Sequence, residues 1–230
     1  MLWLRIKSLI IGRSLSAGFR LPNQNQRKYA TAYASNRSGS KKMAQAKTLN
    51  ERELWRVLGY IAMRKHAARN RAMLLLTHMS GLRVGEVAAL RIGDVFGDNG
   101  LARDEIRLRA EQTKGRHPRT VFLGEKIRKE LNAYSMSIDR SQTTKPLFYT
   151  QKRDGFSANT LAQHFHYLYR RAGIAGASSH SGRRTFITNL ANKGVSVRVL
   201  MALAGHRNIS TTQAYIDVND GMKRAAVELV

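Results

Sequence analysis

The sequence predicts a mainly helical protein with one small antiparallel sheet. Apolar residues recur at helical spacing through most of the chain after residue 50. Residues 105–113 and 119–124 instead favour strands, and the turn-forming run KGRHP at 114–118 joins them. With 230 residues, 43% of them hydrophobic, the chain is long enough for one sizeable core.

Two helices are expected first. The run ERELWRVLGYIAMRK, residues 51–65, can be capped by Thr48 or Asn50, and two glutamates lie in its first turn. The run NRAMLLLTHMSG, residues 70–81, follows, and Gly81 is of the type that commonly ends a helix. A further short helix is expected to start just after it, in GLRVGEVAAL.

The middle of the chain predicts the sheet. Residues 90–100, LRIGDVFGDNG, are expected to contribute to it together with the two strand-like segments and their turn. Helical spacing then returns in 125–138, 157–173 and 181–194, with Ser157 and Ser179 as candidate N-caps.

The last twelve residues, 219–230, predict a short helix capped by Asn219 or Asp220. Its apolar stripe is too small to be stable alone, so it needs a groove to lie in. The stripe consists of Met222, Ala225, Ala226 and Leu229.

The charge balance indicates a nucleic-acid partner. Forty Lys and Arg residues stand against 15 Asp and Glu residues, a formal net charge of +25. A charge of this sign and size attracts a polyphosphate. Cys is absent, which excludes disulfides and thiolate zinc sites, and no apolar run is long enough to span a bilayer. A general basic protein, such as a ribosomal component, is the alternative from charge alone.

Residues 1–42 differ from the rest of the chain. They hold nine basic residues and no acid, the first carboxylate being Glu51. Such a composition is similar to that of an organellar transit peptide. Because Met43 opens a capped helical region, we instead interpret residues 1–42 as an unstructured basic leader before the natural start, and expect a cytoplasmic protein.

Breaking a DNA backbone requires cations for the transition state, a nucleophile and a proton donor for the leaving oxygen. Metal ions can supply the charge, but the one close histidine pair, His164 and His166, points to different faces of a helix. Neither a metal nor another cofactor is therefore expected. Arginine is the best substitute, because its guanidinium grips two phosphate oxygens and stays charged.

Two motifs supply arginines at helix starts. In GLRVGE, Arg83 lies three residues before Glu86 and on the same face, as an oriented cation or as a plain surface ion pair. In HSGRRTFIT, His180 lies at a helix N-terminus with Arg183 and Arg184 one turn later. Spacing does not choose between the two arginines, because i+3 and i+4 both face His180.

Six residues occur in an order that resembles the tyrosine recombinases, the phage integrase family: Arg83, Lys114, His180, Arg183, His206 and Tyr215. The motifs are GLRVGE, TKGRHPRTVFL, HSGRRTFIT and LAGHRNISTTQAYI. Each is weak alone, and together they are specific. They run through residues 48–218, so the resemblance implies the fold of that family's catalytic domain over residues 43–218.

The resemblance implies a role for each residue. Tyr215 would attack the scissile phosphate and form a 3′-phosphotyrosine, while Arg83 and Arg183 hold the non-bridging oxygens. Lys114 would protonate the leaving 5′-oxygen, His180 would act as acid or base, and His206 would bind phosphate. Glu86 would support Arg83. Further contacts to double-stranded DNA are expected from Arg116, Arg119, Arg184 and Arg207.

Two departures from the family pattern stand out. The box that usually reads His-x-Leu-Arg-His has Gly182 and Arg184 in place of the leucine and the last histidine. In addition, some forty residues before the catalytic region are too few for the separate helical DNA-binding domain that family members usually carry.

The function expected from these features is site-specific DNA recombination without metal or ATP, carried out by a homotetramer on DNA or together with a longer recombinase. The resemblance also implies that residues 219–230 dock on a neighbouring subunit. Two alternatives stay open: relaxation of DNA in the manner of a type IB topoisomerase, and a non-catalytic DNA-binding accessory role.

Overall fold

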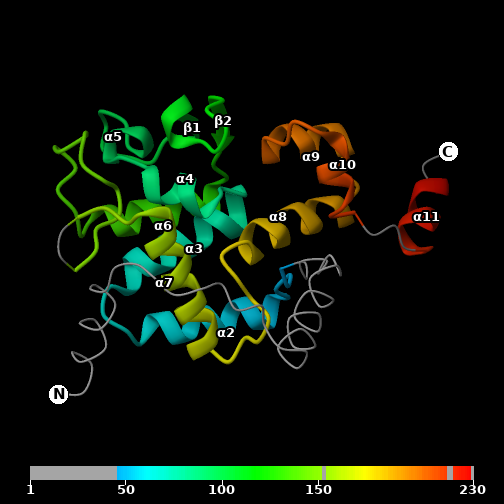
Figure 1. Cartoon of the computed structure of the whole chain (residues 1–230), viewed down its shortest axis with the longest axis horizontal. Helices are drawn as coiled ribbons and strands as arrows, with labels where there is room; N and C mark the ends of the chain where they lie inside the picture. The colour runs from blue at the N-terminus through cyan, green and yellow to red at the C-terminus, as the bar shows by residue number, and fades with distance from the viewer. Residues whose placement is uncertain (1–45, 152–153, 217–219, 229–230) are drawn as a thin grey trace, which may run out of the picture. The chain divides into compact units, whose positions relative to one another are not determined.

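The structure, a computed structural model, describes residues 46–151, 154–216 and 220–228. The leader predicted at residues 1–42 lies outside them. The described helices are α2 (Glu51–Ala62), α3 (Ala67–Ser80), α4 (Val84–Ala89), α5 (Ile92–Val95), α6 (Glu125–Ser135), α7 (Ala158–Arg171), α8 (Ser181–Asn192), α9 (Val197–Ala204), α10 (Ile209–Gln213) and α11 (Asp220–Val227) (Figure 1). A single 3₁₀ turn, η1 (Ala110–Gln112), and two strands, β1 (Glu105–Leu108) and β2 (Arg119–Phe122), complete this part of the chain.

The core forms around α3, which packs against α8, α6 and α2. Most of this helix is buried, and Met73, Leu74, Leu75 and Leu76 are fully excluded from solvent. Four consecutive buried residues place apolar side chains on every side of α3, as expected for a helix enclosed by others. Its C-terminal end is therefore fixed from several directions at once.

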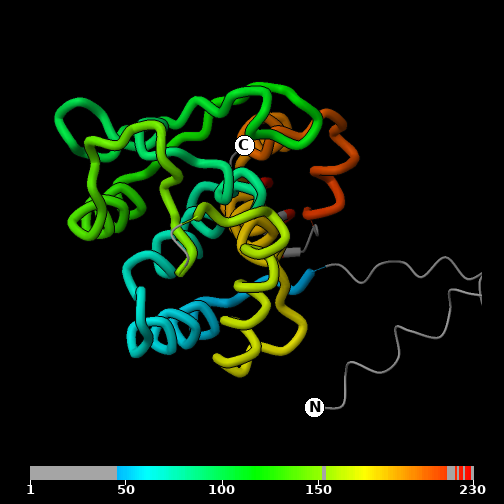
Figure 2. The backbone as a smooth tube through the Cα atoms, turned by 60° about the vertical axis from the view of Figure 1, so that its left-hand side comes forward, coloured from blue at the N-terminus to red at the C-terminus, as the bar shows by residue number. Residues whose placement is uncertain are grey.

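The sheet confirms that the two segments pair, but the first strand is shorter than predicted, because residues 110–112 form the 3₁₀ turn η1. β1 and β2 are antiparallel, with Glu105 opposite Phe122 and Leu108 opposite Arg119. Figure 2 shows the segment that contains this hairpin passing beside the segment that contains α9. The predicted fold class, mainly helical with a small antiparallel sheet, is confirmed for the described residues.

The prediction that residues 90–100 belong to the sheet is wrong. Ile92–Val95 forms the one-turn helix α5, because the Asp94 carboxylate accepts a hydrogen bond from the Arg91 backbone N–H at 2.8 Å. On either side, the extended backbone makes only isolated bridges, Arg91 with Pro146 and Phe96 with Ala102. A local side-chain cap thus outweighs the strand-like composition.

The helix caps were predicted with mixed success. Asn50 caps α2 by accepting from the Glu53 N–H at 2.9 Å, and Ser157 caps α7 by accepting from the Thr160 N–H at 3.1 Å. The Ser179 cap is wrong. Helix α8 begins after His180, which makes no side-chain cap, and the Ser178 N–H donates to Ser181 Oγ at 2.9 Å.

Helices α9 and α10 were not predicted individually, although Ser196 before α9 and Gly205 after it are typical start and stop residues. Gly205 has a φ of 60°, a left-handed conformation that ends the helix. Asn208 then caps α10 by accepting from the Ser210 N–H at 3.0 Å. These two short helices position the segment from Gly205 to Tyr215.

Helix α11 agrees with the short helix expected in 219–230. Asp220 is its first residue and not its cap, and the other candidate cap, Asn219, lies outside the described residues. Of the predicted apolar stripe, only Ala226 has a described side chain, and it is exposed, as is Val227 next to it. No helix within the described ranges has the length and apolar character needed to cross a membrane.

Candidate active site

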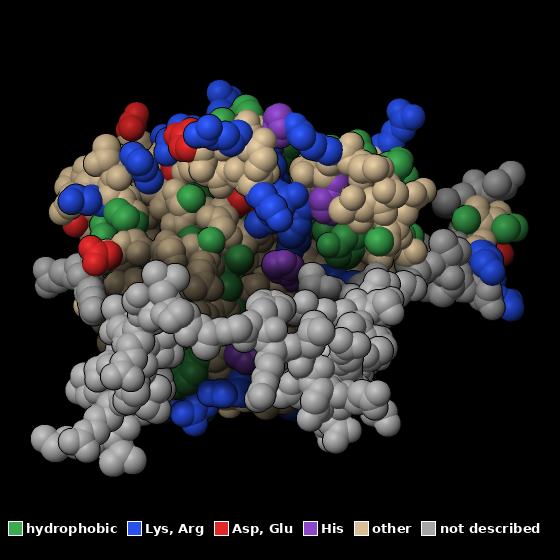
Figure 3. Space-filling model, in the orientation of Figure 1, with side chains coloured by type: hydrophobic (Ala, Val, Ile, Leu, Met, Phe, Trp, Pro, Cys, Tyr) green, Lys and Arg blue, Asp and Glu red, His purple; other side chains and the backbone are tan. Residues whose placement is uncertain are grey.

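The predicted functional residues come from five separate segments that contact one another, and one of them reaches the end of α3. These segments are the start of α4, the hairpin, the start of α8, the α9–α10 loop and the residues just after α10. Figure 3 shows Lys and Arg side chains gathered with histidines on this face, between the sheet and α9.

Glu86 is the centre of the cluster and is 1% exposed. Its carboxylate accepts hydrogen bonds from Arg83 Nη1 at 2.9 Å and from the Arg83 backbone N–H at 2.8 Å. It also accepts from Arg119 Nη2 at 2.7 Å and Nε at 3.2 Å. Burial alone would raise the pKa of Glu86, but Arg119 and Arg83 outweigh it and hold this pKa below its ordinary value. Glu86 is therefore a carboxylate that anchors two guanidinium groups.

The C-terminal carbonyls of α9 hold three arginines. Arg119 Nη1 donates to Leu203 O at 3.0 Å, and Arg83 Nη2 donates to Gly205 O at 3.0 Å. Arg183 Nη2 donates to the carbonyl between them, that of Ala204. The last carbonyls of a helix lack intrahelical partners and carry its negative dipole end, so they attract cations. The C-terminal end of α9 thus orients the three guanidinium groups.

Arg183 is the most buried of these cations, at 7% exposure. Its Nη1 donates to Gly81 O at 2.6 Å, which ties the start of α8 to the end of α3. Burial, together with the charges of Arg83 and Arg119, lowers the pKa of Arg183 to about 9, while Glu86 opposes the shift. The guanidinium therefore remains charged at neutral pH.

The glycine that departs from the family pattern lies at this helix crossing. A Cβ on Gly182 would lie 2.1 Å from Thr77 Oγ1 and 2.7 Å from His78 Nδ1. Because neither atom can move far within a buried helix, α8 approaches α3 this closely only with glycine at position 182. The close approach is what brings Arg183 within reach of Gly81.

We expect Gly182→Ala to lower the free energy of unfolding by about 1–3 kcal/mol, because the added methyl group overpacks the crossing. Urea unfolding measures this. Gly59→Ala is the matched control: position 59 lies in α2 with nothing within 4 Å of an added Cβ. That control should instead raise stability by about 0.5–1 kcal/mol. Equal or greater stability of Gly182→Ala would contradict the crossing as described.

Tyr215 lies just beyond α10 and is half-buried. The ring of His206 stacks on the ring of Tyr215, with centroids 5.7 Å apart and planes inclined by 19°. The Arg184 guanidinium lies over the same ring, with Cζ 5.4 Å from the centroid. Thr188 Oγ1 also donates to the Tyr215 carbonyl at 3.5 Å, so α8 contacts both the side chain and the backbone of this tyrosine.

The two histidines differ in their surroundings. Burial and then the charges of Arg183, Arg83 and Arg119 lower the pKa of His206 to about 4, and Thr212 Oγ1 lies 2.9 Å from its Nδ1. His180 is at the N-terminal end of α8, and partial burial with the charges of Arg183 and Lys114 lowers its pKa. Both imidazoles are therefore neutral at pH 7 and can accept a proton or share a hydrogen bond.

A hollow of about 420 Å³ opens between the hairpin and the α9–α10 loop. Four of the residues that line it are cations, and none is an Asp or Glu: Arg83, Lys114, Arg119 and Arg207 stand beside His206. Such a lining suits a phosphate group. Arg116 is exposed in the turn beside it, with a φ of 56°, but is not part of the lining.

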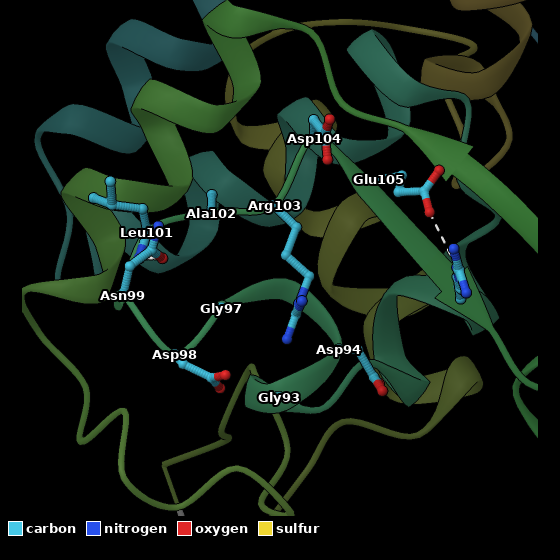
Figure 4. Close-up of a pocket in the computed structure, with 11 residues that line it drawn as sticks. Gly93, Asp94, Gly97, Asp98, Asn99, Leu101, Ala102, Arg103, Asp104 and Glu105 are labelled. Carbon is cyan, nitrogen blue, oxygen red and sulfur yellow. Dashed lines mark hydrogen bonds and ion pairs between the residues drawn. The ribbon is translucent and has the colours of Figure 1, made fainter.

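A larger hollow, of about 770 Å³, is lined by more acidic than basic side chains and is therefore less suited to a phosphate group. It lies along the loop from Gly93 to Glu105, and Figure 4 shows Arg103 extending into it between Asp94 and Asp98. Its charged lining consists of four carboxylates and two arginines: Asp94, Asp98, Asp104, Glu105, Arg103 and Arg107. A phosphate would be repelled there more than at the cationic hollow.

Sequence reasoning missed the part that Arg119 plays. It was expected to contact DNA, whereas its side chain is 11% exposed and engages Glu86 and the Leu203 carbonyl. The local sequence carries no sign of this contact, because Arg119 and Glu86 are 33 residues apart. His78 is buried and His164 is half-buried, and burial lowers the pKa of each to about 4.

No three His, Asp or Glu side chains in the described ranges are arranged to hold a metal ion.

The phage integrase family matches residues 47–222, most of the chain. The chain belongs to the phage integrase family. Among curated relatives, tyrosine recombinase XerA of Pyrococcus furiosus is 28% identical over 186 residues, which is 79% of this chain and 61% of that protein. Tyrosine recombinase XerD of Ralstonia nicotianae is 36% identical over 159 residues, 65% of this chain and 48% of that protein. This family member thus spans between about half and three fifths of the length of such relatives.

Solved structures of integrase-family proteins share the fold. The crystal structure of XerA recombinase aligns with a TM-score of 0.63 at 27% identity, covering 79% of this chain and 64% of that one. XerH recombinase bound to a palindromic difH substrate aligns with a TM-score of 0.60 at 23% identity, covering 78% and 51%. At that identity the XerH likeness concerns the fold alone.

Proposed function

We propose that this protein is a tyrosine recombinase that cuts and rejoins DNA through a covalent 3′-phosphotyrosine. The observation that carries the proposal is the convergence of Arg83, Arg119 and Arg183 on Glu86 and the end of α9, beside a stacked Tyr215. A packed core rarely brings three arginines together unless their charge is used. Membership of the phage integrase family supports the same reaction.

In the proposed cleavage step, Tyr215 Oη forms a bond to the scissile phosphorus while the bond from phosphorus to the 5′-oxygen breaks. The phenol proton passes to His180, and the Lys114 ammonium gives a proton to the departing 5′-oxygen. The products are a 3′-phosphotyrosine and a free 5′-hydroxyl. The lowered pKa of His180 keeps its imidazole neutral and ready to accept that proton.

Arg83 and Arg183 would stabilise the charge that develops on the non-bridging oxygens. Both guanidinium groups are already oriented by protein carbonyls, so little reorganisation is needed when the transition state forms. Arg119 would act indirectly, by holding Glu86 and hence Arg83. His206, neutral beside the hollow, would add a hydrogen bond to phosphate.

Rejoining is the reverse of cleavage. The phosphotyrosine bond retains the energy of the broken linkage, so a 5′-hydroxyl from another strand can displace Tyr215 without ATP. Arg116, exposed beside the hollow, and Arg207, exposed on its lining, would contact the DNA backbone and add sequence-independent affinity. We also propose that exchange takes place in a homotetramer on two DNA sites or with a longer recombinase, with residues 219–230 docking between subunits.

The experiment that tests the proposed function also identifies the DNA sequence that the protein cuts. The full chain is incubated with fragmented genomic DNA of the source organism and denatured in detergent, and DNA that remains attached to protein is sequenced. Mass spectrometry of the attached peptide should show a nucleotide on Tyr215. Attachment through another residue, or no attachment at all, would refute the proposal.

The recovered sites then separate recombination from the alternatives. When two copies of the recovered site are placed on one supercoiled plasmid, a recombinase should invert or excise the DNA segment between them. A topoisomerase-like enzyme would instead relax plasmids that carry no such site. A binding protein without catalysis would retard the DNA in gels and leave no adduct.

We expect the adduct to form equally well in excess EDTA, because side-chain cations supply the charge in the proposed mechanism. The measurement is the yield of adduct on recovered-site DNA with and without the chelator. A loss of activity that magnesium restores would show that the arginines alone are insufficient.

A further inference from the structure

Arg184 is the second residue at which the HSGRR motif departs from the family pattern, and the catalytic scheme above does not use it. It follows Arg183 directly, yet the two side chains have different surroundings. Arg183 is buried against the carbonyls of Gly81 and Ala204. Arg184 is partly exposed and lies over the ring of Tyr215, 5.4 Å from the centroid.

The charge of Arg184 is not paired with a carboxylate. Each of Arg83 and Arg119 forms an ion pair with Glu86, whereas no such pair involves Arg184 anywhere in the described ranges. A guanidinium over an aromatic face is attracted to it electrostatically, and the attraction grows where water is partly excluded. Tyr215 is half-buried and also carries the stacked His206 ring, so its position is restricted by contacts from α8 and the α9–α10 loop.

We propose that Arg184 is a positioning residue for the nucleophile: its guanidinium holds the Tyr215 ring in place and stabilises negative charge on the phenol oxygen as the proton leaves. The assignment rests on the proposed function. It divides the arginine pair by task, with Arg183 acting on the phosphate and Arg184 on the tyrosine. The position usually filled by histidine in this family would here carry a permanent charge.

The test compares variants on three nicked duplexes of the recovered site. The first duplex has the natural phosphate, the second has a methylphosphonate that lacks the negative charge, and the third has sulfur in place of the 5′-bridging oxygen. Loss of a phosphate-binding arginine should be partly rescued by the methylphosphonate. Loss of the proton donor should be rescued by sulfur, which leaves readily without a proton. Loss of Arg184 should be rescued by neither.

On the natural duplex, Arg184→Gln should form the adduct about tenfold more slowly at saturating protein, because a partly desolvated cation–π contact is worth on the order of a tenfold change in rate. Arg184→Lys should recover to within about threefold of the original protein, since it keeps a cation beside the ring. Arg198→Gln is the matched control. It removes the same charge from an exposed position on α9 and should leave the rate unchanged.

Urea unfolding of each variant separates a change in rate from a loss of fold. The assignment would be overturned if Arg184→Gln formed the adduct as fast as the unaltered protein, or if the methylphosphonate rescued that variant. It would also be overturned if Arg184→Lys were as slow as Arg184→Gln. These outcomes leave the proposed function intact. Only a lack of any Tyr215-dependent adduct with the unaltered protein would refute both.

Discussion

Tyr215→Phe is expected to abolish the covalent adduct completely while leaving DNA binding nearly unchanged. Phenylalanine keeps the ring that stacks on His206 and lies beneath Arg184, so the surroundings of position 215 should persist. It lacks the oxygen that would form the bond to phosphorus. Gel electrophoresis under denaturing conditions measures the adduct, and a gel shift under native conditions measures binding.

The matched control for this change is Tyr167→Phe. Tyr167 is an exposed tyrosine of α7, and the variant removes the same hydroxyl group away from the cationic cluster. It should form adduct at the original rate. A denaturation-resistant adduct in Tyr215→Phe would show that the nucleophile has been assigned to the wrong residue.

Arg83→Ala and Arg183→Ala are each expected to slow cleavage on the order of a hundredfold or more, because each removes an oriented charge from the transition state. DNA binding should fall much less, since many other cations contribute to it. The measurement is the rate of adduct formation at saturating protein, so that binding does not enter. A loss confined to binding would place these arginines outside the reaction.

The two variants should differ in their effect on the stability of the fold, which must be separated from their effect on cleavage. Arg83→Ala leaves Glu86 paired with Arg119, so the buried carboxylate keeps a partner. Arg183→Ala leaves the Gly81 and Ala204 carbonyls without their guanidinium donor and should also lower stability. Arg183→Lys retains a charge but not two diverging donors, and a slow but well-folded lysine variant would identify the guanidinium geometry as the requirement.

The sequence alone was sufficient for features that depend on neighbouring residues. The caps at Asn50 and Ser157 were predictable because a capping side chain bonds to the backbone within the same turn. The Arg83–Glu86 pair was predictable because the residue that precedes a helix lies within reach of the third residue of its first turn. The residue types and their order were likewise enough to identify the family.

Features formed by distant segments required the tertiary structure. Arg119 reaches Glu86 only because the hairpin folds over α4, and three arginines meet at the end of α9, a helix that the sequence analysis did not predict.

The choice between Arg183 and Arg184 shows most clearly what local sequence could not predict. Helical spacing places both near His180, so local geometry is the same for each. The packing of α8 on α3 across Gly182 turns Arg183 inward to the Gly81 carbonyl, 102 residues earlier in the chain, and leaves Arg184 facing Tyr215. The sequence determined which chemical groups are present, and the packing of helices distant in sequence decided which guanidinium turns inward to the carbonyls of Gly81 and Ala204 and which faces the tyrosine.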